Sequence, residues 1–199
     1  MTITLLNYTP LPIASHAIRT CWQSFGKSDD GGEKDKELID RVGNKFKHNS
    51  TLEHLNYTFY IKGISRACLQ EVARHRHASL SVKSSRYTLK ELKEEEVLDY
   101  EKYLVFTGDV NVDDASSRAL DRLQAILKSG VSNDIAKYCL PESYKTELTY
   151  TINARSLQNF LSLRSDKSAL WEIRDLAKAL FDTLPEEHKY LFKECIKIG

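Results

Sequence analysis

The sequence lacks several features that mark particular classes of protein. No apolar run approaches the roughly 20 residues that cross a bilayer, so we expect no membrane-spanning helix and no membrane partner. The first residues, MTITLLNYTPLPIASHAIR, do not join a basic start to a long apolar segment, and a secretory signal is therefore not expected. The formal net charge is only +1, so any site for an anion must be a local cluster of charge.

Several short motifs are missing as well. There is no CxxC pair, and the cysteines are widely spaced, which argues against a zinc site or a redox pair and suits a reducing, cytoplasmic location. We expect no bound metal. The sequence has neither GxGxxG after a strand nor GxxxxGK[ST], so any nucleotide must be held by a different device.

The 199 residues are enough for one domain with a sizeable core, and 41% of them are apolar. Alternating apolar residues predict strands over 2–8, 55–62 and 144–152. Periodic patterns predict helices over 13–24, 36–47, 65–77, 112–129, 132–139, 154–164, 168–183 and 186–196. The Ser-rich stretch 78–89 is predicted to be a loop, and the charged run 90–103 a solvated face. Because strands and helices do not alternate regularly, we expect an α+β fold in which a small antiparallel sheet packs with several helices in a single domain over 1–199.

A basic cluster is the first candidate site. Five cationic or potentially cationic groups lie within thirteen residues: Arg74, His75, Arg76, Lys83 and Arg86. On a helix the side chains of Arg74, His75 and Arg76 would spread over roughly 200°, too widely for all three to join one ion pair. So many positive charges in a short segment favour a bound anion. Guanidinium groups match phosphate, and Ser84 with Ser85 can complete a phosphate nest. The alternative is a basic helix end followed by a Ser-rich surface loop.

The predicted helix over 154–164 is the second candidate site. Leu157, Phe160 and Leu161 form one apolar stripe that ends at Arg164. An arginine in that position either snorkels to solvent or is held in a cleft by an anion or a hydrogen-bond partner. Both interpretations remain open from the pattern alone.

A third polar segment, 48–54, precedes the strand predicted over 55–62. A metal site there would need further ligands that the sequence does not place. Polar loop residues that cap the strand are the simpler interpretation.

Three motifs together resemble the flavin-dependent thymidylate synthases. Arg74-His75-Arg76, then seven residues, then Ser84, is similar to the signature of that family. The segment 153–164, followed by Trp171-Glu172-Ile173, and the segment 50–54 also resemble family motifs, in the expected order. The resemblance covers roughly residues 15–185.

The resemblance implies a homotetramer whose active sites combine residues of several subunits, and roles for particular residues. The FAD-binding set that it implies is Ser50, Glu53, Arg74, His75, Arg76, Asn153, Arg155 and Asn159. The dUMP-binding set is Glu71, Arg74, Lys83, Ser84, Ser85, Arg86, Lys137 and Arg164.

The implied reaction is the reductive methylation of dUMP to dTMP, with 5,10-methylenetetrahydrofolate as carbon donor. Arg164 would be the catalytic residue, stabilising negative charge on the uracil so that its carbon 5 attacks the folate methylene. Reduced FAD would supply the hydride, NADPH would reduce the flavin again, and no cysteine would act as nucleophile.

Three positions depart from the family pattern. Val82 stands where Glu or Gln is common, Lys137 replaces an arginine expected on dUMP, and Cys21 lies where a serine often contacts the flavin. A nucleotide-binding or nucleic-acid-binding module built on 74–86 is the alternative function. The small net charge and the lack of interleaved aromatic residues argue against nucleic acid as a partner.

Overall fold

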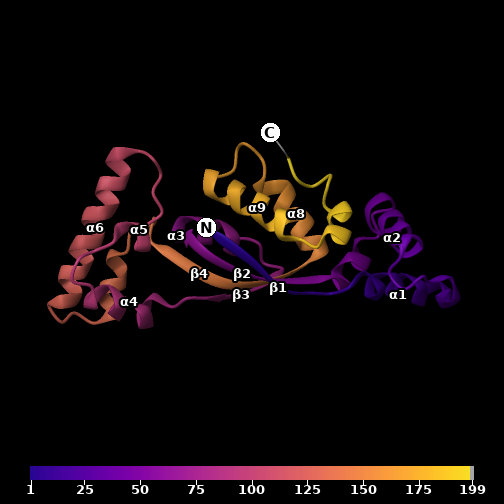
Figure 1. Ribbon diagram of the computed structural model, residues 1–199, viewed down its shortest axis with the longest axis horizontal. Coiled ribbons are helices and arrows are strands. Elements are labelled where there is room, and N and C mark those ends of the chain that lie inside the picture. The colour runs from indigo at the N-terminus through magenta and orange to yellow at the C-terminus, as the bar shows by residue number, and fades with distance from the viewer. Residues whose placement is uncertain (198–199) are drawn as a thin grey trace. The chain divides into compact units, whose positions relative to one another are not determined.

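The computed structural model describes residues 1–197 and contains a four-stranded antiparallel sheet together with several helices (Figure 1). The strands are β1 (Thr2–Tyr8), β2 (Asn56–Ser65), β3 (Ala78–Val82) and β4 (Lys145–Asn153), in the spatial order β1-β2-β4-β3. The predicted α+β class with a small antiparallel sheet is confirmed.

The chain forms two compact units. The first unit comprises Met1, Lys62–Ala73 and Ser81–Leu148. The second unit comprises Thr2–Ile61, Arg74–Leu80 and the described chain from Thr149 onward. The assignment of 1–199 to a single domain stays a prediction.

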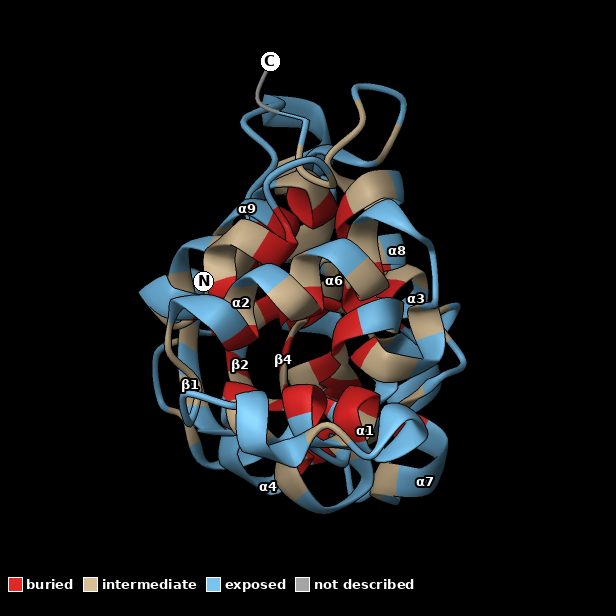
Figure 2. Ribbon diagram, turned by 90° about the vertical axis from the view of Figure 1, so that its right-hand side faces the viewer, coloured by how far each residue is buried: buried red, intermediate tan, exposed pale blue. Residues whose placement is uncertain are grey.

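The second unit contains the helices at both ends of the chain. These are α1 (Leu11–Trp22), the 3-10 helix Phe25–Lys27, α2 (Glu33–Ile39), the π-helical turn Asp40–Lys45, the 3-10 helix Asn49–His54, α8 (Ala154–Arg164), α9 (Trp171–Thr183) and the 3-10 helix Glu186–Leu191. Helices α8 and α9 lie side by side, and α9 packs against β1 (Figure 1). Around α1 in Figure 2, buried and exposed residues share the same turns, as expected for an amphipathic helix.

The first unit is built around a separate apolar cluster. Its helices are α3 (Arg66–Ala73), α4 (Ser85–Glu94), α5 (Tyr100–Tyr103), α6 (Val110–Lys128) and α7 (Asn133–Ala136), with the 3-10 turn Lys137–Cys139 after α7. Helix α6 packs against α4 and α7. The cluster consists of Leu89, Leu92, Tyr103, Leu104, Leu120, Leu123, Leu127, Ala136 and Tyr144.

Several predicted elements agree closely with the structure. Strand β1 and helix α8 have the predicted bounds, and the alternating side of β2, including Tyr57 and Phe59, is completely buried. Ser65 caps α3, because its Oγ accepts a hydrogen bond of 2.9 Å from the backbone N–H of Cys68.

Other predictions were wrong. The stretch 78–89 is not a loop: it contains β3 and the start of α4. Residues 90–103 are not simply a solvated face, because Leu92 and Tyr103 are buried in the apolar cluster. Strand β2 continues through Gly63, whose positive φ of 78° suits a residue without a side chain. At the C-terminal end, the predicted helix over 186–196 is a shorter 3-10 helix.

Helix α3 also differs from its prediction, with a consequence for the basic cluster. It ends at Ala73, so Arg74, His75 and Arg76 lie in the connection to β3 and do not fan around a helix.

No helix among residues 1–197 is long and apolar enough to cross a membrane.

Candidate active site

The residues of the two predicted binding sets fall largely in different units. The whole FAD-binding set lies in the second unit. The dUMP-binding set lies in the first unit except for Arg74 and Arg164, which belong to the second. Each group can therefore be described within its own unit.

In the second unit, the first turn of α8 is joined to the 3-10 helix Asn49–His54. Arg155 Nη1 donates a hydrogen bond of 2.6 Å to Glu53 Oε1, and about half of each side chain is exposed. Asn153 holds the start of α8, because its Oδ1 accepts from the backbone N–H of Ser156. Ser50 and Asn159 are exposed. Two motifs 102 residues apart in sequence are thus in direct contact.

At the other end of α8, Arg164 is held by the basic cluster. Its Nε donates a hydrogen bond of 2.8 Å to Nε2 of His75. The His75 ring in turn packs against Phe160, with ring centroids 4.6 Å apart. Of the two interpretations left open for this arginine, the structure supports the one with a hydrogen-bond partner: Arg164 is half-buried and does not simply snorkel.

The bond between Arg164 and His75 determines the form of the imidazole. An arginine Nε carries a hydrogen and can only donate, so Nε2 of His75 must accept and carries no proton. The imidazole is therefore neutral, with its proton on Nδ1. Arg74 and Arg76, on either side of His75, are exposed to solvent.

In the first unit, Ser84 and Ser85 begin a helix. Ser84 is the N-cap of α4, and its side chain makes no capping hydrogen bond. The first backbone N–H groups of a helix and its dipole favour a bound anion. Ser84 and Ser85, predicted to lie in a loop, thus lie at a helix start instead, and their role in binding phosphate stays a prediction.

Arg86, in the first turn of α4, already has an anionic partner. Its Nε lies 2.5 Å from Oδ1 of Asp134 at the start of α7, and both side chains are 56% exposed. Its guanidinium also lies over the ring of Tyr87, 5.6 Å from the centroid. Asp134 was missed by the sequence analysis, since a lone carboxylate 48 positions away carries no local signal.

The other members of the dUMP-binding set have different surroundings. Lys83 Nζ lies 3.6 Å from carboxylate oxygens of both Glu91 and Glu147, so its charge is largely balanced within the protein. Lys137 is exposed on a turn that packs against α4. Glu71 is half-buried on α3.

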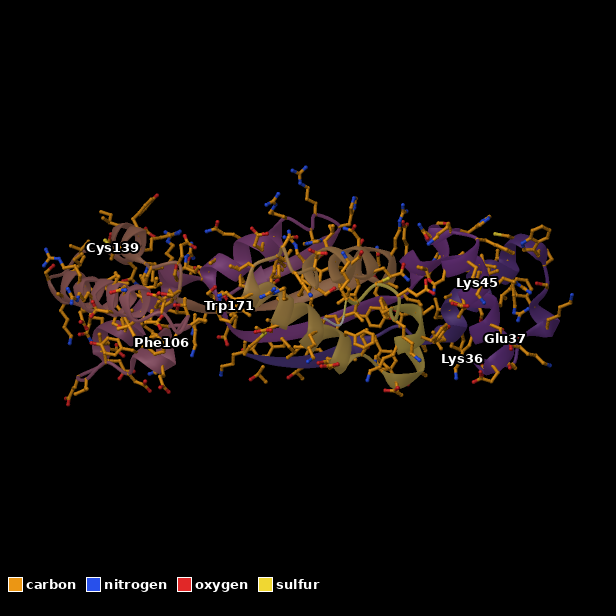
Figure 3. The ribbon with its side chains drawn as sticks, turned by 90° about the horizontal axis from the view of Figure 1, so that it is seen from above. Lys36, Glu37, Lys45, Phe106, Cys139 and Trp171 are labelled. Carbon is orange, nitrogen blue, oxygen red and sulfur yellow. The ribbon has the colours of Figure 1, made fainter. Side chains whose placement is uncertain are left out.

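The surroundings of Cys68 and Cys195 do not indicate a thiol activated as a nucleophile. Cys68 is buried, and burial raises the pKa of the half-buried Cys195, which keeps that thiol protonated near neutral pH. Cys21 and Cys139 are exposed, and Cys139 lies on the turn after α7 (Figure 3).

A pocket of about 350 Å³ lies in the second unit, apart from these residues. It is lined by Glu33, Lys36, Glu37, Asp40, Glu186, Glu187 and Tyr190. Lys36 and Glu37 come from α2 (Figure 3). Because carboxylates predominate in the lining, the pocket is electrostatically unsuited to a phosphorylated ligand.

Comparison with known proteins identifies the family. The sequence model of the thymidylate synthase complementing protein family matches residues 4–188. The chain belongs to this family. The match includes every member of the two binding sets, from Ser50 to Arg164.

Relatives within the thymidylate synthase complementing protein family are similar over their full length. The chain is 71% identical to the flavin-dependent thymidylate synthase of Campylobacter jejuni (strain RM1221), with 98% of each chain covered. It is 60% identical to that of Helicobacter pylori (strain ATCC 700392 / 26695), covering 99% of this chain and all of the relative. The crystal structure of thymidylate synthase X from Helicobacter pylori with FAD and dUMP covers all of both chains with a TM-score of 0.95.

Proposed function

We propose that this chain is a flavin-dependent thymidylate synthase that converts dUMP to dTMP. The observation that carries the proposal is the 71% identity, over 98% of the chain, to a relative of that name. The carbon donor is 5,10-methylenetetrahydrofolate, the hydride comes from a flavin, and NADPH is the reductant.

The FAD-binding set has the chemistry that the cofactor requires. Arg74, Arg76 and Arg155 present exposed guanidinium groups, which suit the pyrophosphate, and Asn159 offers an exposed amide. When bound, reduced FAD supplies the hydride that completes the methyl group. The contact between Glu53 and Arg155 orients one of these guanidinium groups before the cofactor arrives.

The dUMP phosphate binds at the start of α4. Backbone N–H groups of Ser85 and Arg86, together with the Arg86 guanidinium, are the donors. Arg86 must exchange Asp134 for the phosphate, and this exchange costs little because the ion pair is exposed. Lys137 adds a positive charge, but its ammonium group lacks the planar pair of hydrogen-bond donors that an arginine offers to a phosphate.

Arg164 performs the electrostatic part of the reaction. Its guanidinium stabilises negative charge that develops on the uracil ring, and this polarisation makes carbon 5 nucleophilic. A half-buried cation is more effective in this role than an exposed one, since less water screens its charge. Carbon 5 is activated in this way without a covalent bond to a cysteine.

We further propose a homotetramer whose active sites combine residues of several subunits, in the cytoplasm. Large apolar side chains are exposed in the second unit, among them Trp22 at 81% and Phe46 at 63%. Exposed apolar surface of this kind is typical of contacts with another chain. Light scattering of active protein should give the mass of four chains, and full activity from a monomer at the same concentration would reject the assembly.

The function is tested by anaerobic turnover. Purified protein is given dUMP, methylenetetrahydrofolate, FAD and NADPH, and dTMP is measured, with single omissions of each component as controls. We expect dTMP only in the complete mixture, and a visible flavin absorption band in the protein. A colourless protein that binds nucleic acid and forms no dTMP would instead favour the module built on 74–86.

A further inference from the structure

The C-terminal end of α8 and the Arg74–His77 connection form one packed arrangement. Phe160 is completely buried and lies one helical turn before Arg164 on the same face of α8. His75 packs against Phe160 and accepts the hydrogen bond from Arg164 Nε. A single imidazole thus contacts two residues of α8, one apolar and one charged, from a segment 89 positions away from Arg164.

The geometry restricts the orientation of the guanidinium group. Arginine has several rotatable bonds, and ordering such a side chain costs conformational entropy. A hydrogen bond to Nε is made in the guanidinium plane, so it determines how that plane is rotated and where the two Nη atoms point. Because His75 is itself packed against a buried ring, the acceptor is well placed before any ligand binds.

We propose that His75 is a positioning residue for the uracil step, which it serves by orienting the guanidinium of Arg164. This role goes beyond the flavin contact expected of His75, and it rests on the proposed function. The neutral imidazole accepts from Nε and adds no second positive charge beside the guanidinium.

Two substitutions of His75 separate the hydrogen bond from the packing. His75→Phe keeps an aromatic ring against Phe160 but removes the acceptor. His75→Gln keeps an acceptor at about the position of Nε2 but removes the ring. His77→Phe is the matched control, because His77 is an exposed histidine in the same connection. For each variant we would measure bound FAD, dUMP-independent oxidation of NADPH, and kcat and KM for dTMP formation.

We expect His75→Phe to lower kcat for dTMP formation by about 10- to 100-fold, the size of effect caused by a misplaced catalytic group. At saturating FAD, dUMP-independent NADPH oxidation should fall less than kcat, because flavin reduction does not need an activated uracil. His75→Gln should recover part of the lost kcat, and His77→Phe should behave as the wild type. Parallel loss of FAD, NADPH oxidation and dTMP formation in His75→Phe would overturn the proposal, since it would indicate a role in flavin binding or folding alone.

A double-substitution cycle gives a second test, of whether His75 acts through Arg164. If His75 acts through Arg164, His75→Phe should cost little further kcat in an Arg164→Lys background. Independent, multiplicative losses would overturn the proposal. Nitrogen-15 NMR of the wild type should show His75 with its proton on Nδ1, and a proton on Nε2 would also overturn it. Absence of dTMP from the wild type would be a failure of the proposed function and is seen before any variant is made.

Discussion

Asp35 is expected to make the second unit sensitive to acid. Its carboxylate is completely buried and accepts hydrogen bonds at both oxygens. Arg19 donates to Oδ1 from Nε at 3.2 Å and from Nη2 at 2.6 Å. Oδ2 accepts from Ser28 Oγ at 2.5 Å and from the backbone N–H of Gly31 at 3.1 Å. This network joins α1, the loop that follows it, and α2.

The pKa of Asp35 gives the size of the effect. Burial by itself raises this pKa, but the hydrogen bonds from Ser28, Arg19 and Gly31 outweigh burial and lower it from 3.8 to about 2. A shift of nearly two units corresponds to about 2 kcal/mol of stability from the ionised form. The folded-state pKa is the lower one, so this stability is fully present above about pH 4 and is lost as the pH falls toward 2.

Urea unfolding at pH 7 and pH 3 measures this contribution. We expect Asp35→Asn to destabilise the protein at pH 7 by about 3–5 kcal/mol, because it leaves the buried Arg19 without its anionic partner. The acid-dependent loss should be smaller in that variant than in the wild type. Asp30→Asn is the control, since Asp30 is exposed and should have little effect. Equal stability of Asp35→Asn and the control at pH 7 would refute this reasoning.

Substitutions at three further positions test the site and its core. Arg86→Ala should weaken dUMP binding by about 1.5–3 kcal/mol while FAD binding is largely kept, and equal weakening in titrations of both ligands would reject its assignment to the phosphate. Both Arg164→Ala and Arg164→Lys should lower dTMP formation by about 100-fold or more, while bound FAD is retained. Turnover equal to the wild type by the lysine variant at saturating dUMP would contradict the role given to the planar guanidinium group. Tyr150 is completely buried and its hydroxyl has no hydrogen-bond partner among residues 1–197. Tyr150→Phe should therefore leave the melting temperature unchanged or raise it, and a clear decrease would show that the hydroxyl is satisfied in solution.

Elements with a strong local pattern were predicted well from the sequence. Helix α8 has an N-cap asparagine at 153 and an apolar stripe with helical spacing, so its bounds follow from neighbouring residues. The alternation around Tyr57 and Phe59 predicted one buried side of β2 for the same reason.

The region around β3 and α4 was not predictable in this way. Backbone N–H of Lys83 donates to the carbonyl of Glu147, so the end of β3 depends on a partner 64 positions away. Helix α4 buries only Leu89 and Leu92, which is too short an apolar pattern to stand out from a charged surface. Long-range pairing and the apolar cluster outweigh weak local propensity here.

The sequence by itself determined which chemical groups this protein has for binding anions, because the order and spacing of the motifs around Arg74, Ser84 and Arg155 are properties of the chain. Only the tertiary structure decided which of those groups meet. It joined Glu53 to Arg155 and His75 to Arg164, and it paired Arg86 with Asp134. The physical reason is that a hydrogen bond depends on distance and direction in space, and folding sets both through packing contacts that no local pattern contains.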